Sequence, residues 1–393
     1  MKLTVVVQRY GSDIVGGAER LARGVAEGLA RRHEVEVVTT CAHSYRTWAN
    51  HYPEGTEVLN GVRVRRFRTL RERDVTSFNA LSEALFATAR TPQQELEWID
   101  AQGPYAPALV DYLHTAARDR DLLLFFTYLY HPTVHGIHAA PERSVLVPTA
   151  HDEAPFWMET YRAVFTLPAG LVFNTVAEQE LVRRRFPELP QPQRVIGAGI
   201  EGLETLEAAS RQVADAVPET PTLVYAGRIE EGKGVGELLA LLRRYRQDTG
   251  REIRLWLMGE QAMELPQEDW IVPLGLVSEQ EKAERLARAT LLAAPSALES
   301  FGIVLLEALA AGTPVLANAA SAAYLEHCTR SNGGLCYRNY PELRAALDLL
   351  LTDPRLRQTM ATQGAAYVRD NYSWPAIIKA YDDFLTALQP QGR

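Results

Sequence analysis

Two successive alternations of short apolar runs with helical patterns constrain the fold of this 393-residue chain more than any other feature. Each apolar run has the length of a strand, and segments with the apolar spacing of helices lie between the runs. The first series has apolar runs at residues 3–7, 36–40, 122–127, 144–147 and 171–173 and a helical pattern at 18–32. Strands that alternate with helices form a parallel sheet covered on both faces, so we expect a doubly wound α/β domain.

The second series follows a stretch rich in proline and glycine, which is typical of a hinge. Its apolar runs and helical patterns lie at residues 223–226, 236–245, 253–258, 278–289, 291–294, 302–311 and 315–317. We therefore expect two facing doubly wound, Rossmann-like domains. The predicted boundaries are 1–198 for the N-terminal domain, 199–370 for the C-terminal domain, and 371–393 for a C-terminal helix that packs back across the hinge. Because ligands of such sheets bind beyond the carboxyl ends of the strands, we expect the site between the domains.

Composition narrows the class of ligand. The formal net charge of -8 argues against a nucleic-acid partner, because phosphate contacts need a basic surface. Cys41, Cys328 and Cys336 lack metal-ligand spacing, and so few cysteines indicate a reducing compartment. The first apolar run is too short for a signal peptide or a membrane span. We expect a cytoplasmic protein that binds a small molecule.

Three glycines at the hinge, Gly197, Gly199 and Gly202, match the G-x-G-x-x-G pattern of dinucleotide-binding domains. That pattern needs a solid preceding strand and a small residue four positions after the last glycine. Here only two apolar residues precede the glycines, and Leu206 takes the small position. We interpret the segment as a turn and expect no redox cofactor.

A glycine-rich turn carries Arg228 and Lys233 between a predicted strand and a predicted helix, where α/β domains bind anions. Arginine offers a planar fork to phosphate oxygens and lysine a compact mobile charge. The chain has only four lysines, so a lysine in this turn suggests a binding role. The alternative is a solvated charged turn.

Two carboxylates eight residues apart, Glu299 and Glu307, flank the predicted start of a helix. Glu299 is expected in the loop, and Glu307 about two turns into the helix. Gly302 would let a phosphate approach the amides of Gly302, Ile303 and Val304, where the helix dipole adds partial positive charge. The alternative is a capped helix in which Glu307 is merely paired.

Two features of the N-terminal domain point to the same site. Gly16 and Gly17 follow the first strand and open a helix whose amides could cradle an anion. His151 and Asp152 stand at the carboxyl end of another predicted strand. A lone histidine is more often structural than functional, so His151 needs support from the other motifs.

Together these motifs resemble the retaining glycosyltransferases of family 4, which have the GT-B architecture. The resemblance spans the chain in the family's order and rests on Gly16-Gly17-Ala18-Glu19, His151-Asp152, Gly227-Arg228, Lys233-Gly234, Glu299-x7-Glu307 and Gly312-Thr313-Pro314-Val315. It implies that the N-terminal domain binds the acceptor and the C-terminal domain the nucleotide-sugar donor.

The resemblance implies a role for each matching residue. Arg228 and Lys233 would bind the donor diphosphate, Glu307 the ribose and Glu299 the transferred sugar. Gly17 would close over the diphosphate, His151 would lie near the reacting sugar, and the segment ending at Val277 would read the base. The implied donor-binding set is Gly16, Gly17, Arg228, Lys233, Val277, Glu299, Phe301, Gly302, Ile303, Val304 and Glu307, and the implied catalytic set is His151, Glu299, Arg228 and Lys233.

We expect no essential metal and no cofactor besides the nucleotide-diphosphate sugar that serves as substrate. Breaking the anomeric bond leaves charge on the diphosphate, and Arg228, Lys233 and the helix N-terminus can stabilise it. Asp119 and Asp121 look like a metal-binding pair, but they precede a predicted strand at the wrong end of the sheet. The resemblance also implies retention of anomeric configuration, with the leaving phosphate taking the acceptor's proton.

Two other functions remain open: a nucleotide-sugar epimerase of the same fold and a catalytically silent partner subunit. The acceptor could be a glycan, a lipid-linked molecule or a small molecule, and its specificity is expected around residues 70–110 and 128–132. A dense run of arginines reads as a solvated edge strand and loop, or alternatively as a patch that meets anionic lipid in a peripheral contact on the inner membrane face. Its members are Arg63, Arg65, Arg66, Arg68, Arg71 and Arg73.

Overall fold

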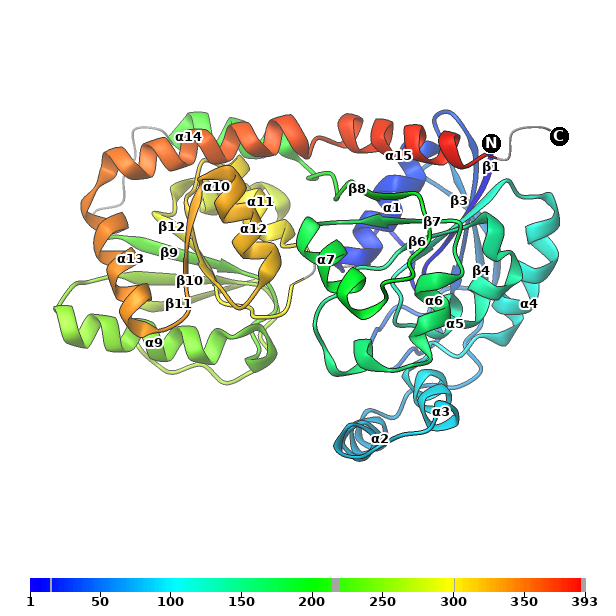
Figure 1. Ribbon diagram of the computed structural model, residues 1–393. Coiled ribbons are helices and arrows are strands. Elements are labelled where there is room, and N and C mark those ends of the chain that lie inside the picture. The colour runs from blue at the N-terminus through cyan, green and yellow to red at the C-terminus, as the bar shows by residue number, and fades with distance from the viewer. Residues whose placement is uncertain (15, 214–219, 300, 390–393) are drawn as a thin grey trace. The chain divides into compact units, whose positions relative to one another are not determined.

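The computed structural model describes residues 1–14, 16–213, 220–299 and 301–389. The chain divides into two compact units, each with its own sheet (Figure 1). Unit 1 comprises Met1–Gly199 and Trp374–Arg393, and unit 2 comprises Ile200–Ser373. The division falls one residue after the predicted boundary at 198, and the C-terminal segment returns to unit 1 three residues later than predicted.

Unit 1 contains an eight-stranded sheet in the order β3-β4-β2-β1-β5-β6-β7-β8. All neighbouring strands are parallel except β3 and β4, which form an antiparallel hairpin at one edge. The strands are β1 Lys2–Val6, β2 Glu34–Thr40, β3 Gly55–Leu59, β4 Val62–Phe67, β5 Leu122–Phe126, β6 Ser144–Val147, β7 Gly170–Phe173 and β8 Gln193–Val195. The central strands are apolar on both faces because helices cover both faces, and β5 is buried at all five positions.

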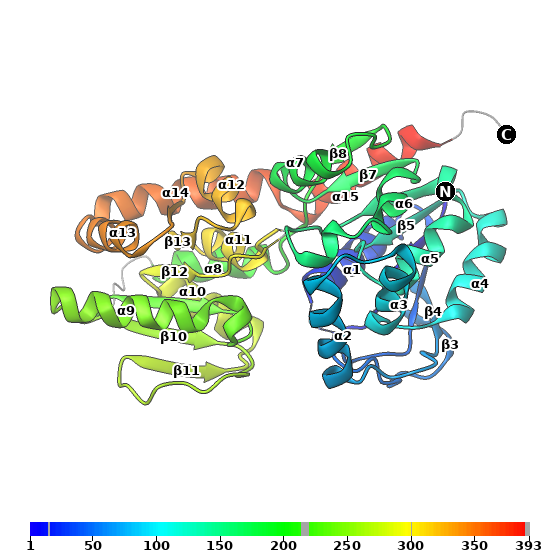
Figure 2. The same cartoon turned by 60° about the horizontal axis from the view of Figure 1, so that its bottom comes forward.

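Helices of unit 1 form two layers (Figures 1 and 2). In one layer, helices α2 to α7 share a core of buried side chains with the sheet, while α1 packs with α15. The helices are α1 Gly17–Leu29, α2 Val75–Ala87, α3 Pro92–Gln102, α4 Pro107–Ala116, α5 His131–Gly136, α6 Tyr161–Thr166, α7 Val176–Arg185 and α15 Trp374–Leu388. The pair α2 and α3 projects from the body of the unit beyond the sheet.

Unit 2 contains a six-stranded parallel sheet in the order β11-β10-β9-β12-β13-β14. The strands are β9 Thr222–Ala226, β10 Arg254–Met258, β11 Ile271–Gly275, β12 Leu291–Ala294, β13 Val315–Asn318 and β14 Gly334–Tyr337. Helices α9 and α13 bury their apolar faces in one core with the sheet, and α8, α10 and α11 pack together (Figure 2). The helices are α8 Leu203–Val213, α9 Val235–Thr249, α10 Glu279–Arg288, α11 Ile303–Ala310, α12 Ala322–Ser331, α13 Tyr340–Thr352 and α14 Pro354–Asn371.

The expected α/β class and the two doubly wound sheets are confirmed, but three local expectations are wrong. The predicted C-terminal helix at 371–393 begins only at Trp374 and ends at Leu388, as α15. A strand, β8, does precede the hinge glycines, and α8 follows them. This strand and this helix belong to different units, so they do not make the strand-turn-helix of one dinucleotide-binding domain.

The third wrong expectation concerns the arginine run, since β4 is not an edge strand. It pairs with β2 on one side and β3 on the other. Arg66 is buried, binds Glu57 and the carbonyl of Tyr10, and lies over the ring of Tyr52. Arg65 binds Glu36 at 3.1 Å. Arg65 and Arg66 therefore bind other residues of unit 1.

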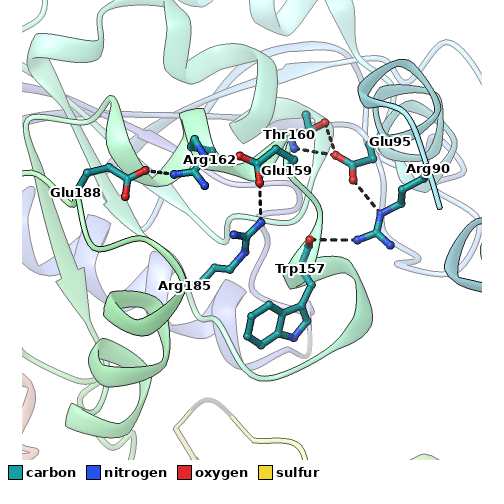
Figure 3. A network of polar contacts seen from close by, with 8 residues as sticks. All are labelled: Arg90, Glu95, Trp157, Glu159, Thr160, Arg162, Arg185 and Glu188. Carbon is teal, nitrogen blue, oxygen red and sulfur yellow. Dashed lines mark hydrogen bonds and ion pairs between the residues drawn. The ribbon is translucent and has the colours of Figure 1, made fainter. Parts of the chain in front are cut away.

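A polar network fixes the segment between β6 and α6 within unit 1 (Figure 3). The buried carboxylate of Glu95 on α3 accepts hydrogen bonds from the amide and hydroxyl of Thr160, each at 2.8 Å, and from Arg90 at 2.8 Å. Arg90 also donates to the carbonyl of Trp157. The remaining ion pairs join Arg162 to Glu159 and Glu188, and Arg185 to Glu159. The amino end of α3 is thereby tied to this segment.

No helix in the part of the chain that the structure describes is long and apolar enough to cross a lipid bilayer.

Candidate active site

The strand order of unit 2 reverses direction between β9 and β12. From β9 the chain builds outward through β10 and β11, and from β12 it builds the other way through β13 and β14. Doubly wound sheets bind ligands at this point, beyond the carboxyl ends of the strands. The loop after β9 carries Arg228 and Lys233, and the loop after β12 carries Glu299. Their position at the switch point favours a ligand site.

The turn after β9 presents both cations at the surface. It runs through a short 3-10 helix, Glu231–Lys233, into α9. Arg228 lies 3.2 Å from Glu230, and its side chain is 38% exposed. The hydroxyl of Tyr225 donates to the backbone carbonyl of Arg228 at 2.6 Å, which holds the turn against its own strand. The guanidinium is therefore fixed at its base and accessible at its tip.

Lys233 and Glu299 join the two loops. Nζ of Lys233 lies 2.8 Å from Oε1 of Glu299, although 66 residues separate them in the chain. Gly234 has φ 74°, and a Cβ there would lie 2.7 Å from the carbonyl oxygen of Pro295. A side chain at this position would push the loops apart, so glycine is needed for their close approach.

Among the described residues, no side chain caps the N-terminus of α11. Gly302 caps the helix in a left-handed conformation, φ 79° and ψ 50°, and Ile303 and Val304 begin the first turn, whose amides have no partner within the helix. Phe301 is buried against His327, whose Nε2 lies 2.9 Å from the Phe301 carbonyl. The capping segment is therefore anchored on α12.

Glu307 lies one turn into α11, not two, because the helix begins at Ile303. Its side chain is 2% exposed, and its Oε1 accepts a hydrogen bond from Nζ of Lys282 at 2.8 Å. Burial acts to lower the pKa of Lys282, but the charges and hydrogen bonds of Glu307 and Glu279 outweigh burial and raise it above its usual value. Lys282 was not predicted. The rarity of lysine in the chain was the one sequence signal that could have identified it.

Val277 lies in the loop between β11 and α10, next to Ser278, which caps α10. The loop begins at Gly275, whose carbonyl accepts a hydrogen bond from the amide of Gly259 at 2.8 Å. Leu276 is 81% exposed. This loop thus lies at the same carboxyl edge of the unit 2 sheet as Arg228 and Lys233.

In unit 1, the strand order reverses between β1 and β5. Gly16 caps α1 and Gly17 begins it, after the loop that follows β1. The carboxylate of Glu19 packs so closely against Gly16 that a Cβ there would lie 2.2 Å from it. Arg9 binds the same carboxylate at 2.6 Å, and both side chains are buried. A carboxylate of the chain itself therefore lies at this helix N-terminus, which the sequence interpretation did not foresee.

His151 lies in the loop after β6, as expected, and Glu153 accompanies it. Nε2 of His151 lies 3.3 Å from Glu153, which also accepts a hydrogen bond from the hydroxyl of Tyr128 at 2.7 Å. Burial acts to raise the pKa of Glu153, but His151 and Tyr128 outweigh burial and lower it below its usual value. His151 therefore has an ionised carboxylate beside it. Asp152 points elsewhere and accepts from the indole of Trp157.

Glu178 is a second acid that the sequence interpretation missed. Its buried carboxylate on α7 accepts hydrogen bonds from the amides of Ala150, at 2.6 Å, and Asn174, at 2.7 Å. Burial raises the pKa of Glu178 to about 8. Because Ala150 precedes His151, Glu178 fixes the backbone that carries the histidine.

The acidic pair Asp119 and Asp121 lies at the amino end of β5, as expected. Asp121 accepts a hydrogen bond from the amide of Lys2 at 2.7 Å. This carboxylate therefore ties β1 to β5 at the end of the sheet opposite His151.

Comparison with known proteins agrees with this architecture. Residues 207–367 match the family model of glycosyl transferases group 1. A glycogen synthase of Mycobacterium tuberculosis is 25% identical, covering 100% of this chain and 97% of its own length. A D-inositol 3-phosphate glycosyltransferase of Corynebacterium diphtheriae is 29% identical over 52% of this chain and 53% of its own length.

Among solved structures, a sucrose-phosphate synthase from Thermosynechococcus elongatus matches with a TM-score of 0.72 and 18% identity, covering 98% of both chains. The Anabaena protein HepE, in complex with UDP and glucose, matches with a TM-score of 0.68 and 18% identity, covering 98% of this chain and all of its own. These structural likenesses show the fold, and the family model and the sequence relatives are those of glycosyltransferases. The chain is a glycosyltransferase of the GT-B fold, an enzyme of the hexosyltransferase type.

Proposed function

We propose that the protein transfers a sugar from a nucleotide-diphosphate sugar to an acceptor hydroxyl, with retention of configuration and without a metal, as a member of glycosyltransferase family 4. The observation that carries this proposal is the Lys233–Glu299 contact of 2.8 Å across the switch point of unit 2. This contact brings the Lys233 ammonium and the Glu299 carboxylate together in the loops that lead to α9 and α11. A sugar diphosphate would bind there, beside the N-terminus of α11.

In this mechanism the anomeric carbon–oxygen bond to the diphosphate breaks while the acceptor oxygen bonds to the same face of the sugar. Arg228, Lys233 and the amides of Ile303 and Val304 stabilise the charge that develops on the leaving diphosphate. The departing phosphate oxygen takes the proton of the acceptor hydroxyl. No redox step occurs, and fixed positive groups take the place of a bridging cation.

The other donor contacts follow from the site's chemistry. Glu307 accepts hydrogen bonds from the ribose hydroxyls, and the hydrogen bond from Lys282 orients this carboxylate. Glu299 binds the transferred sugar. Hydroxyls of the sugar replace part of the contact that Glu299 makes with Lys233. The backbone around Val277 reads the nucleobase. From unit 1, Gly16 and Gly17 approach the diphosphate, while His151, oriented by Glu153, contacts the sugar.

The acceptor binds in a pocket of unit 1 within the stretch that is expected to set specificity. Its walls include the aromatic rings of Trp48, Phe78 and Tyr105 together with Arg71 and Asp100. Arg71 stacks over Tyr105 at 4.2 Å. Aromatic faces combined with charged donors and acceptors suit a sugar or a phosphorylated small molecule.

A panel of nucleotide sugars, each with candidate acceptors, tests the proposal in the presence of excess chelator. We expect release of a nucleoside diphosphate together with a glycosylated product whose anomeric configuration, read by NMR, matches the donor. Isomerised donor without transfer would instead identify an epimerase. Absence of donor binding and turnover would identify a silent subunit, and inversion would contradict the retaining mechanism.

A further inference from the structure

A cluster of Asp100, His131 and His135 lies in unit 1, apart from the residues assigned to the reaction. Asp100 is near the end of α3, and the two histidines stand four residues apart on α5. Nε2 of His135 lies 3.1 Å from Oδ1 of Asp100, and Nε2 of His131 lies 3.7 Å from the same oxygen. The three potential ligand atoms all lie within 4.8 Å of one another.

These distances are those of a metal site. Two atoms bound tetrahedrally to zinc at about 2.0 to 2.2 Å lie roughly 3.3 to 3.6 Å apart, which both measured separations approach. Histidines at i and i+4 share one face of a helix and can reach one ion. Two imidazoles and one carboxylate form a ligand set typical of divalent transition metals.

His131 supplies an independent observation. Its ring is 3% exposed, and within the described ranges of the chain Nδ1 has no hydrogen-bond partner. Its Nε2 points to Asp100 at a distance beyond a hydrogen bond. A metal ion bound at Nε2 would give this nitrogen the partner that Asp100 is too far away to provide.

A simple ion pair explains only part of this arrangement. A hydrogen bond between His135 and Asp100 accounts for their contact of 3.1 Å. It gives no reason for a second, buried imidazole to be aimed at the same oxygen, with the two rings 4.4 Å apart between centroids.

We propose that Asp100, His131 and His135 bind one divalent transition-metal ion, Zn²⁺ fitting best, with water as the fourth ligand. About a third of each of the His135 and Asp100 side chains is exposed, which leaves room for that water. The ion would fasten the carboxyl end of α3 to α5, while the Glu95 network fastens its amino end. Because Asp100 also lines the pocket, the ion would stiffen one wall of it.

The test uses the full chain without a polyhistidine tag, stripped with chelator and dialysed. Zn²⁺ is titrated against a chromophoric chelator, and Co²⁺ is added separately to record the visible spectrum of its coordination. The variants are His135→Ala and Asp100→Asn, with His114→Ala on the exposed face of α4 as the matched control. Circular dichroism of each metal-free protein checks that the variants fold.

We expect wild type and His114→Ala to bind one equivalent of Zn²⁺, to give a tetrahedral Co²⁺ spectrum and to gain melting temperature with Zn²⁺. His135→Ala and Asp100→Asn should each lose at least about tenfold in Zn²⁺ affinity and lose the Co²⁺ spectrum. Wild-type protein that binds no stoichiometric Zn²⁺, or folded variants that bind it as tightly as wild type, would overturn the proposal. Both readouts are independent of sugar transfer.

Discussion

Lys282 and Glu307 form an ion pair between α10 and α11, with Nζ 2.8 Å from Oε1 and only 13% and 2% of the two side chains exposed. Removing one partner of a buried pair leaves the other charge without its compensation. Lys282→Met should therefore destabilise the protein by roughly 3 to 5 kcal/mol. Urea unfolding measures this loss.

Lys379 provides the control for that variant. It pairs with Asp383 on α15, but its side chain is 72% exposed. Lys379→Met should change the free energy of unfolding by less than about 0.5 kcal/mol. Equal effects of the two variants would show that burial of the Lys282 pair has no energetic consequence.

The buried acid Glu178 should make stability depend on pH. Burial raises its folded pKa from 4.5 to about 8. Between these values the folded state holds a proton that the unfolded state has lost, so the contribution of Glu178 to stability falls as pH rises from 4.5 to 8. Wild type should lose stability relative to Glu178→Gln over this window. Parallel pH profiles of melting temperature would contradict the raised pKa.

Transfer should continue in excess EDTA, because Arg228, Lys233 and the N-terminus of α11 supply the positive charge that a cation would otherwise provide. The assay is run with saturating acceptor at a temperature where the chelated protein stays folded, because loss of the proposed zinc ion would affect stability and one wall of the acceptor pocket. Complete loss of transfer by folded protein, with rescue by Mg²⁺ or Mn²⁺, would show that the donor site needs a metal.

Vesicles containing anionic lipid should not bind the protein through its arginine run. Arg66 and Arg65 are held by Glu57 and Glu36, and Arg73 donates to the carbonyls of Tyr45 and Arg46. Co-sedimentation with anionic and neutral vesicles checks this expectation. The remaining exposed members are Arg63, Arg68 and Arg71. Binding to anionic vesicles that disappears when these three become glutamine would instead establish a peripheral membrane contact.

The sequence predicts the central strands well because each is a continuous apolar run between turns. The predicted bounds of β6 and β12 coincide with the observed ones. It misses β3, which is almost wholly exposed and has only two apolar residues, and it therefore places β4 at the edge of the sheet. It also fails at β8, because prolines around a three-residue strand resemble a turn.

The candidate site was also predicted only in part. The sequence could locate Arg228, Lys233, Glu299 and Gly302, because each adjoins the end of a strand or the start of a helix. Other contacts join residues that only tertiary packing brings together. Lys282 reaches Glu307 because α10 packs on α11, and Asp100 meets His135 because α3 packs on α5. Spacing along the sequence carries no signal for such pairs.

The central claim is that Arg228 and Lys233 stabilise the departing diphosphate. Their side chains are 38% and 31% exposed. Arg244→Ala is the matched control, because Arg244 is an exposed arginine on α9 of the same unit. Melting temperatures of all variants should stay close to that of wild type.

The most direct test is kcat/KM for sugar transfer by Arg228→Ala and Lys233→Ala at saturating acceptor. Each variant should lose about 2 to 4 kcal/mol of transition-state stabilisation, which is roughly a 30- to 1,000-fold fall, while Arg244→Ala keeps wild-type activity. Near wild-type kcat/KM in both Arg228→Ala and Lys233→Ala would contradict the assignment of the diphosphate to this turn.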